Sequence, residues 1–214
     1  MLLDLASHSD IGWRNENEDS ILAQETVGFI LAAVADGLGG HGGGKTASSL
    51  AVQILEERQE RLKTMREEDL RAVCDEINER ILAAQTPVLR MKTTLALALV
   101  SGDALAFLHV GDSRVYLFRA GTIEYQSKDH SVSQLAVLTG AIKPEQIRFH
   151  EDRNKVLRSL GSENGATPDI QLLEGPLHPG DAVLLGTDGF WDYVTAQEMT
   201  SALNRAMAAQ DWLA

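Results

Sequence analysis

The sequence predicts an α+β domain in which antiparallel strands and helices form separate layers. Several short runs rich in apolar and β-branched residues are typical of strands. Tight glycine turns at 102–103 and 120–121 join neighbouring runs as hairpins, and two long helical patterns are inserted between the second and third strands. Since no Pro/Gly/Ser-rich linker divides the 214 residues, we expect one domain over residues 1–214.

The individual elements follow from the local patterns. Strands are predicted at residues 2–7, 27–35, 93–101, 105–110, 115–119, 122–126 and 182–187. Helices at 47–63 and 67–85 carry apolar residues at helical spacing, and a shorter helix is predicted at 195–209. Cys74 lies on the apolar stripe of the second helix, which indicates a small core residue.

Composition and charge exclude several classes of protein. The chain has 19 Lys and Arg against 31 Asp and Glu, and its net charge of −12 repels nucleic-acid backbones and anionic lipid. A single cysteine excludes an internal disulfide and a Cys-rich zinc site. The first residues lack the pattern of a secretory signal, and the apolar runs are far shorter than the ~20 residues of a membrane span. We therefore expect a cytoplasmic protein that binds neither nucleic acid nor membrane.

Acidic residues recur where apolar strands end beside a glycine. Asp36-Gly37, Gly111-Asp112 and Asp188-Gly189 each follow such a strand. A single Asp in this position is most often a turn former or helix cap, but three converging carboxylates would repel one another unless a cation joined them. Oxygen ligands without cysteine favour Mg²⁺ or Mn²⁺. Arg14 and Arg114 are candidates to hold a phosphate bidentately, and for Arg114 we favour a structural ion pair.

A competing motif lies at residues 39–46, which match the phosphate-binding loop pattern G-x-x-x-x-G-K-[ST]. In such a loop Lys45 would contact phosphates and Thr46 would bind Mg²⁺. That loop belongs to parallel α/β folds, whereas the predicted hairpins are antiparallel, and it would leave the acidic strand ends unexplained. Nucleotide binding is therefore the minor alternative.

Taken together, the motifs resemble those of the metal-dependent PP2C (PPM) family of protein serine/threonine phosphatases, in its short bacterial form. The resemblance spans residues 8 to about 195 as an ordered set: Arg14-x-x-Asn17-Glu18-Asp19, Val34-Ala35-Asp36-Gly37-Leu38-Gly39-Gly40-His41, Thr93-Thr94, Val110-Gly111-Asp112-Ser113-Arg114, Asp129-His130-Ser131, Arg153-Asn154 with Leu160-Gly161, and Leu184-Leu185-Gly186-Thr187-Asp188-Gly189.

The resemblance implies a β-sandwich of two antiparallel sheets flanked by helices, with a binuclear Mn²⁺ or Mg²⁺ centre at one end. By position, it assigns metal ligation to the Asp36 carboxylate, the Gly37 carbonyl and Asp188, and a third, weaker metal site to Asp112 with Asp188. It also implies that Glu18 and Asp19 hold water at the metals, that Arg14 holds the substrate phosphate, and that residues 129–151 form a mobile flap. The protein is then expected to be a monomer that acts on phosphoproteins, with a serine/threonine kinase or its targets as partners.

The sequence departs from the family pattern in three places. Lys45 stands where the family usually has Glu, and Lys92 where it usually has Gly; for both we favour a solvated surface position. Nothing after Asp188 matches the family's closing Gly-x-x-Asp-Asn-x-Thr segment, so we expect one metal ligand and the last strand or strands of a sheet to be missing. Truncation and a naturally short, weakly active protein both explain this. A catalytically weak module that binds a phosphoprotein or kinase is therefore the main alternative to an active phosphatase.

Overall fold

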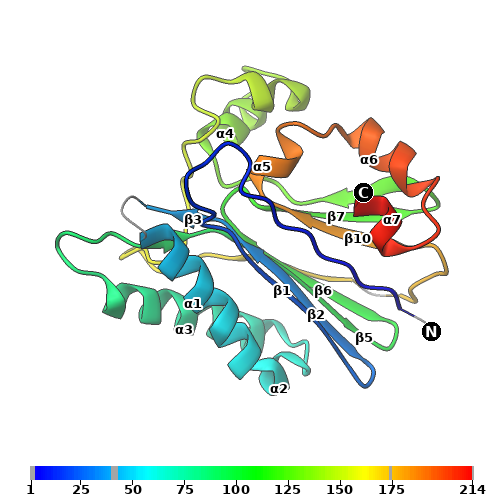
Figure 1. Cartoon of the computed structure of the whole chain (residues 1–214), viewed down its shortest axis with the longest axis horizontal. Helices are drawn as coiled ribbons and strands as arrows, with labels where there is room; N and C mark the ends of the chain where they lie inside the picture. Colours follow the sequence, from blue (N-terminus) through cyan, green and yellow to red (C-terminus); the bar gives the residue numbers. More distant parts are fainter. Residues whose placement is uncertain (1–2, 40–42, 174, 214) are drawn as a thin grey trace.

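The structure, a computed structural model, describes residues 3–39, 43–173 and 175–213. Its elements form four layers: helices, a five-stranded sheet, a three-stranded sheet and further helices (Figure 1). This arrangement confirms the predicted α+β sandwich of two antiparallel sheets flanked by helices. All strand pairs of the described residues are antiparallel, which places the ends of strands from both sheets together.

The larger sheet has the strand order β1-β2-β5-β6-β9. Hairpins connect its first strands in pairs. Gly102 turns β5 into β6, as predicted, whereas Gly28 turns β1 into β2 within the segment predicted as the strand 27–35; both glycines have positive φ. The bounds are β1 Ser20–Thr26, β2 Phe29–Ala35, β5 Leu95–Ser101, β6 Ala104–Val110 and β9 Asp169–Leu173.

The smaller sheet has the order β10-β7-β8, and a separate two-stranded ladder joins β3 to β4. In the described part of the chain β10 pairs only with β7 and is an edge strand. The bounds are β3 Gly37–Leu38, β4 Lys92–Thr93, β7 Arg114–Arg119, β8 Thr122–Gln126 and β10 Ala182–Gly186.

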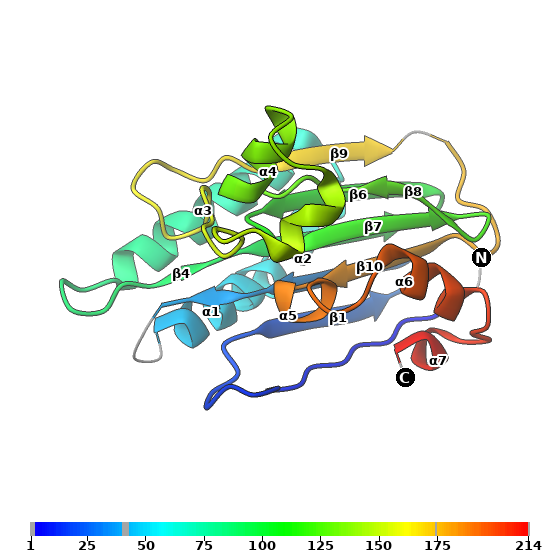
Figure 2. The same cartoon turned by 90° about the horizontal axis from the view of Figure 1, so that it is seen from above.

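Helices cover the outer faces of both sheets. Figure 1 shows α1 and α3 against the five-stranded sheet, and Figure 2 shows α5 and α6 over the strands of the other. The bounds are α1 Gly43–Glu57, α2 Gln59–Leu62, α3 Glu67–Ala84, α4 Val132–Leu138, α5 Asp188–Trp191, α6 Ala196–Leu203 and α7 Ala209–Leu213, with the 3-10 helix η1 at Pro144–Phe149.

Three apolar layers hold the sandwich together, and the two-residue period of the strands assigns side chains to them. On β5, Leu97 and Leu99 pack under α1 and α3, whereas Ala96 and Ala98 face the other sheet. On β7 the same alternation sends Val115 and Leu117 inward. Its remaining side chains, Tyr116 and Phe118, join α5, α6 and α7 in the third layer.

Two strand predictions are wrong. Residues 3–7, the described part of the strand predicted at 2–7, form no strand; the segment is instead tied to α7, where the Ala209 N–H donates to Asp4 Oδ2 at 2.7 Å. The sequence analysis also missed β9. That strand pairs on one side only, with β6, and none of its five residues is buried; its two polar residues, Asp169 and Gln171, interrupt the apolar pattern by which the other strands were predicted.

The predicted helices are present, but the bounds of two of them differ from the prediction. The predicted helix at 47–63 begins four residues earlier, at Gly43, and divides into α1 and α2. The one predicted at 195–209 ends at Leu203; Asn204 caps it, and its side-chain N–H donates to the Gly121 carbonyl at 3.3 Å.

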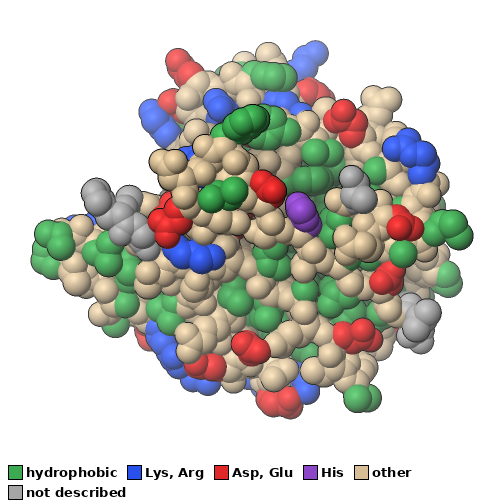
Figure 3. All heavy atoms as spheres, viewed as in Figure 1, with side chains coloured by type: hydrophobic (Ala, Val, Ile, Leu, Met, Phe, Trp, Pro, Cys, Tyr) green, Lys and Arg blue, Asp and Glu red, His purple; other side chains and the backbone are tan. Residues whose placement is uncertain are grey.

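The surface carries its negative charge in dispersed form. On the face drawn in Figure 3, Asp and Glu side chains lie scattered among apolar and polar ones. Within residues 3–39, 43–173 and 175–213, no helix combines the length and the apolar character that crossing a bilayer requires.

Candidate metal centre

The predicted acidic strand ends come together at one end of the sandwich. Asp36 follows β2, Asp112 lies between β6 and β7, and Asp188 begins α5 directly after β10. The charges of Asp188, Asp19 and Asp112 all raise the pKa of Asp36, and Asp36 hydrogen-bonds to Asp188. Four carboxylates, three of them just after strands and Asp19 just before β1, therefore share one site.

Hydroxyl groups fix the position of Asp36. Its N–H donates to Thr94 Oγ1 at 3.0 Å, and its carbonyl accepts from the Thr94 N–H and the Thr93 hydroxyl, both at 2.9 Å. Thr94 Oγ1 also hydrogen-bonds to Ser113 Oγ at 2.6 Å, and all three hydroxyl residues are buried. The Thr-Thr pair thus holds the Asp36 turn and links it to the turn that carries Asp112.

Close backbone packing brings Glu18 and Gly37 to the same place. A side chain on Gly37 would lie 2.3 Å from Gly44 and 2.7 Å from the Glu18 carbonyl, and one on Gly44 would lie 2.7 Å from Glu18 Oε1. Only glycine permits this approach of β3 to the first turn of α1. The contact explains why α1 begins at its two glycines instead of at the predicted Ala47.

Asp19 is fixed by two groups that sequence reasoning did not assign to the site. The Thr187 hydroxyl donates to Asp19 Oδ2 at 2.9 Å, which joins the N-terminal segment to the residue before Asp188. The Lys45 ammonium donates to the Asp19 carbonyl at 2.7 Å. Lys45 is thus half-buried beside the carboxylates, and the prediction of a solvated surface position is wrong for it; Lys92 is exposed, as predicted.

Asp112 is 3% exposed and is held by an aromatic and a cationic neighbour. The Trp191 indole N–H donates to the Asp112 carbonyl at 3.0 Å. The Arg114 guanidinium lies 3.5 Å from the centre of the Trp191 ring and makes two 2.7 Å hydrogen bonds to Asp129. Arg114 therefore forms a structural ion pair, as favoured, although its partner lies outside its own turn.

The carboxylates destabilise one another's ionised forms. Burial and the neighbouring carboxylates, Asp188 first, raise the pKa of Asp36 to about 9. Burial and Asp188 raise the pKa of Asp112 to about 7, and burial raises that of Asp19. At neutral pH such a cluster retains protons unless a divalent cation replaces them.

This donor set fits Mn²⁺ or Mg²⁺. Its ligands are hard oxygens, and Asp192, whose pKa the charge of Asp188 helps to raise, has a buried Oδ1 with no hydrogen-bond partner in the described structure. No three of the described carboxylates at this site bring oxygens within 4.8 Å of one another. Each cation would accordingly be shared by few carboxylates and keep several waters, which suits the strongly hydrated Mg²⁺ and Mn²⁺.

A second group of possible ligands, His109, His130 and Asp169, brings its ligand atoms within 4.8 Å of one another. Three of its four ring nitrogens have hydrogen-bond partners. His109 Nε2 donates to the Lys128 carbonyl at 2.9 Å. His130 Nδ1 accepts from the Gly111 N–H at 3.2 Å, so its protonated Nε2 faces Asp169 Oδ2 at 3.3 Å. We assign no metal to this group, whose contacts instead support the turn before Asp112.

Arg14 is the predicted site residue that the structure leaves apart from the cluster's contacts. It is exposed in a turn closed by its own N–H, which donates to the Ile11 carbonyl at 3.2 Å. The predicted phosphate-binding loop at 39–46 lies partly outside the described residues. The part that is described favours no nucleotide site, because the Lys45 ammonium contacts Asp19 and every described strand pair is antiparallel.

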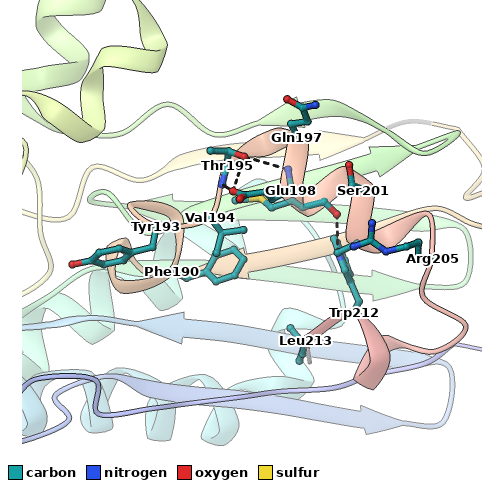
Figure 4. A pocket seen from close by; sticks show the side chains of 12 residues that line it. Phe190, Tyr193, Val194, Thr195, Gln197, Glu198, Ser201, Arg205, Trp212 and Leu213 are labelled. Atoms are coloured by element: carbon teal, nitrogen blue, oxygen red, sulfur yellow. Dashed lines mark hydrogen bonds between the residues drawn. The ribbon is translucent and has the colours of Figure 1, made fainter.

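One hollow of the described surface lies away from the carboxylates. It has a volume of about 660 Å³ between α5, α6 and α7 (Figure 4). Phe190, Val194 and Trp212 line it, and none of the predicted ligands does.

The fold and the site define a β-sandwich protein with an acidic, cation-binding end. Residues 7–211 match the family model described as "Protein phosphatase 2C". The chain belongs to the protein phosphatase 2C family, which confirms the resemblance inferred from its motifs.

Several relatives carry the same assignment. The chain is 35% identical over 211 residues to "Serine/threonine protein phosphatase PstP" of Mycobacterium tuberculosis, covering 95% of this chain and 39% of that protein, so it spans well under half of the relative's length. It is 33% identical over 199 residues to "Serine/threonine phosphatase stp" of Listeria welshimeri, covering 89% and 78% of the two chains.

A solved relative, the catalytic domain of PstP in complex with two manganese ions, superposes with a TM-score of 0.75. It is 32% identical, and the match covers 98% of this chain and 87% of that one.

Proposed function

We propose that this protein hydrolyses phosphoserine and phosphothreonine in proteins, with water activated by Mn²⁺ or Mg²⁺. The observation that carries the proposal is the convergence of Asp36, Asp112 and Asp188, whose mutual repulsion a divalent cation relieves. Family membership and the PstP structure with two manganese ions support the same chemistry.

The residues divide the work as follows. Asp36, the Gly37 carbonyl and Asp188 would hold two cations, and Asp112 with Asp188 would hold a third more weakly. Bound cations supply a water of lowered pKa and positive charge for the phosphate. Glu18 and Asp19 orient that water, and Thr187 keeps Asp19 Oδ2 in place for it.

Arg14 binds the substrate phosphate. Its side chain is exposed and makes no ion pair among the described residues, so its guanidinium can hold two phosphate oxygens. We further propose that the protein acts in the cytoplasm, as a monomer, on targets of a serine/threonine kinase. Size-exclusion chromatography with light scattering tests the monomer.

The test is phosphate release from a phosphothreonine peptide with Mn²⁺ or Mg²⁺ and after chelation. We expect turnover only with metal, and its loss in Asp36→Asn and in Asp188→Asn. Asp103→Asn, in the exposed β5–β6 turn, makes the same chemical change away from the site and should leave turnover unchanged. Arg14→Ala should raise KM about tenfold, since it removes a charge-assisted contact to phosphate.

Two outcomes contradict the proposal. Full activity in both ligand variants would show that the cluster does not hold the working metals. Tight, metal-independent binding of the phosphopeptide without any turnover would favour the alternative of a phosphoprotein- or kinase-binding module.

A further inference from the structure

The positively charged side chain of Lys45 lies beside Asp19 of the acidic site. It occupies the first turn of α1, directly after Gly44, whose backbone packs against Gly37 and Glu18. Its ammonium donates to the Asp19 carbonyl at 2.7 Å and lies 3.4 Å from Ser20 Oγ. Two hydrogen bonds and partial burial therefore keep this charge beside Asp19.

The position matters because the site is otherwise anionic. Asp19, Asp36, Asp112 and Asp188 interact electrostatically with one another. A nearby ammonium stabilises the ionised carboxylates of the metal-free protein, and the same positive charge repels an incoming divalent cation. Lys45 therefore stabilises the metal-free form of the site and lowers the affinity of the site for a divalent cation.

We propose that Lys45 is a resident counter-ion that lowers the affinity of this centre for Mn²⁺ and Mg²⁺, acting on the cation nearest Asp19. The inference rests on the proposed ligand set. It makes the protein respond to metal at higher concentrations than the same site would without the ammonium. Lys45 is a positioning residue and contacts no substrate atom in this assignment.

Calorimetric titration of the whole chain with Mn²⁺ tests the inference without measuring turnover. In Lys45→Met we expect Mn²⁺ to bind about three- to tenfold more tightly, the effect of removing one charge several ångströms from a cation. Lys45→Arg keeps the charge and should stay within about twofold of the wild type. The difference between Lys45→Met and wild type should shrink as NaCl rises from low to ~0.5 M, because salt screens the repulsion.

Lys92→Met is the matched control. Lys92 pairs with Leu38 on the strand beside Gly37, but its side chain is exposed, so solvent screens its charge and Mn²⁺ affinity should not change. Thermal unfolding after chelation supplies a second readout: Lys45→Met should be less stable than wild type without metal while it binds metal more tightly. A purely structural tie between α1 and the residues before β1 would lower both quantities together.

The outcomes separate this inference from the proposed function. If the wild type binds Mn²⁺ and Lys45→Met binds it equally or less tightly, the counter-ion role is refuted and the metal centre stands. If the wild type binds no Mn²⁺, both are refuted. If Lys45→Met unfolds during purification, Lys45→Gln, which retains a donor toward the Asp19 carbonyl, gives the same comparison.

Discussion

Replacing Asp36 with asparagine should stabilise the metal-free protein. Asp36 has a pKa of about 9 in the fold, against about 3.9 in an unfolded chain. Its folded pKa is raised, so between these two values the unfolded state binds fewer protons, and stability falls as pH rises. Asparagine has the shape of the protonated carboxyl and does not suffer this loss.

The size of the effect follows from the same values. At pH 7.5 the linkage sets an upper limit of about 5 kcal/mol, from ~3.6 pH units above the unfolded pKa at ~1.36 kcal/mol each. Because Asp36 is only partly buried and water screens its neighbours, we expect about 1–2 kcal/mol. For a chain of this size that corresponds to roughly 2–8 °C in Tm.

Thermal and urea unfolding, followed by circular dichroism in a chelating buffer from pH 4.5 to 8.5, measure the difference. The advantage of Asp36→Asn should be largest at the alkaline end and vanish toward pH 4. Added Mn²⁺ should reverse the order, because only the wild type retains the ligand. A variant less stable than the wild type at pH 8 without metal would refute the account of repelling carboxylates.

Asp69 supplies a control of opposite sign. Hydrogen bonds from Arg61, Thr64 and Arg66 lower its pKa to about 2, so its ionised form stabilises the fold at neutral pH. Asp69→Asn on α3 should therefore destabilise the protein at pH 7.5, and Mn²⁺ should raise its Tm as much as that of the wild type.

Two further predictions concern residues that support the site. Trp191→Phe keeps an aromatic ring near Arg114 but removes the N–H that donates to the Asp112 carbonyl; urea unfolding should show a loss of about 1–2 kcal/mol, and Mn²⁺ titration a weaker affinity. Burial and His109 lower the pKa of His130 to about 4, so the stability from its neutral form is present above ~6.5 and is lost as pH falls toward 4. The urea midpoint of the wild type should fall through that window more steeply than that of His130→Gln, and equal slopes would exclude the histidine as the cause.

The sequence predicted most of the strands because each one that lies in the interior has a clear apolar pattern. β5 and β7 present apolar side chains to both faces, and glycine turns fix their hairpins. β9 was missed because it is a short edge strand with no buried residue, and only its pairing with β6 identifies it. The segment at 3–7 was over-predicted for the converse reason: it has an apolar pattern but pairs with no strand among the described residues.

The sequence indicated which acidic residues form the candidate site, but not which other residues contact them. An Asp beside a Gly at a strand end is a local signal, and its recurrence at Asp36, Asp112 and Asp188 predicted that these three side chains meet. Thr187 and Lys45 join the site only through tertiary packing with Asp19, 168 and 26 residues away in sequence. A local sequence pattern cannot predict contacts between residues so far apart in sequence. At position 45, the general preference of lysine for solvent led to the wrong prediction of a solvated surface position.

The way the cluster is built explains why the fold tolerates it. Asp36, Asp112 and Asp188 each stand one or two residues beyond a strand with side chains in the core layers, so the energy of apolar burial fixes the backbone that carries them. Thr94 and Ser113 then lock two of these ends together through a buried hydroxyl pair, and Trp191 ties a third to Asp112. The carboxylates cannot relax apart without breaking those contacts. The carboxylates of the metal-free protein therefore stay close and repel one another, which lowers the stability of the fold. Binding of a divalent cation removes this repulsion and raises the stability again.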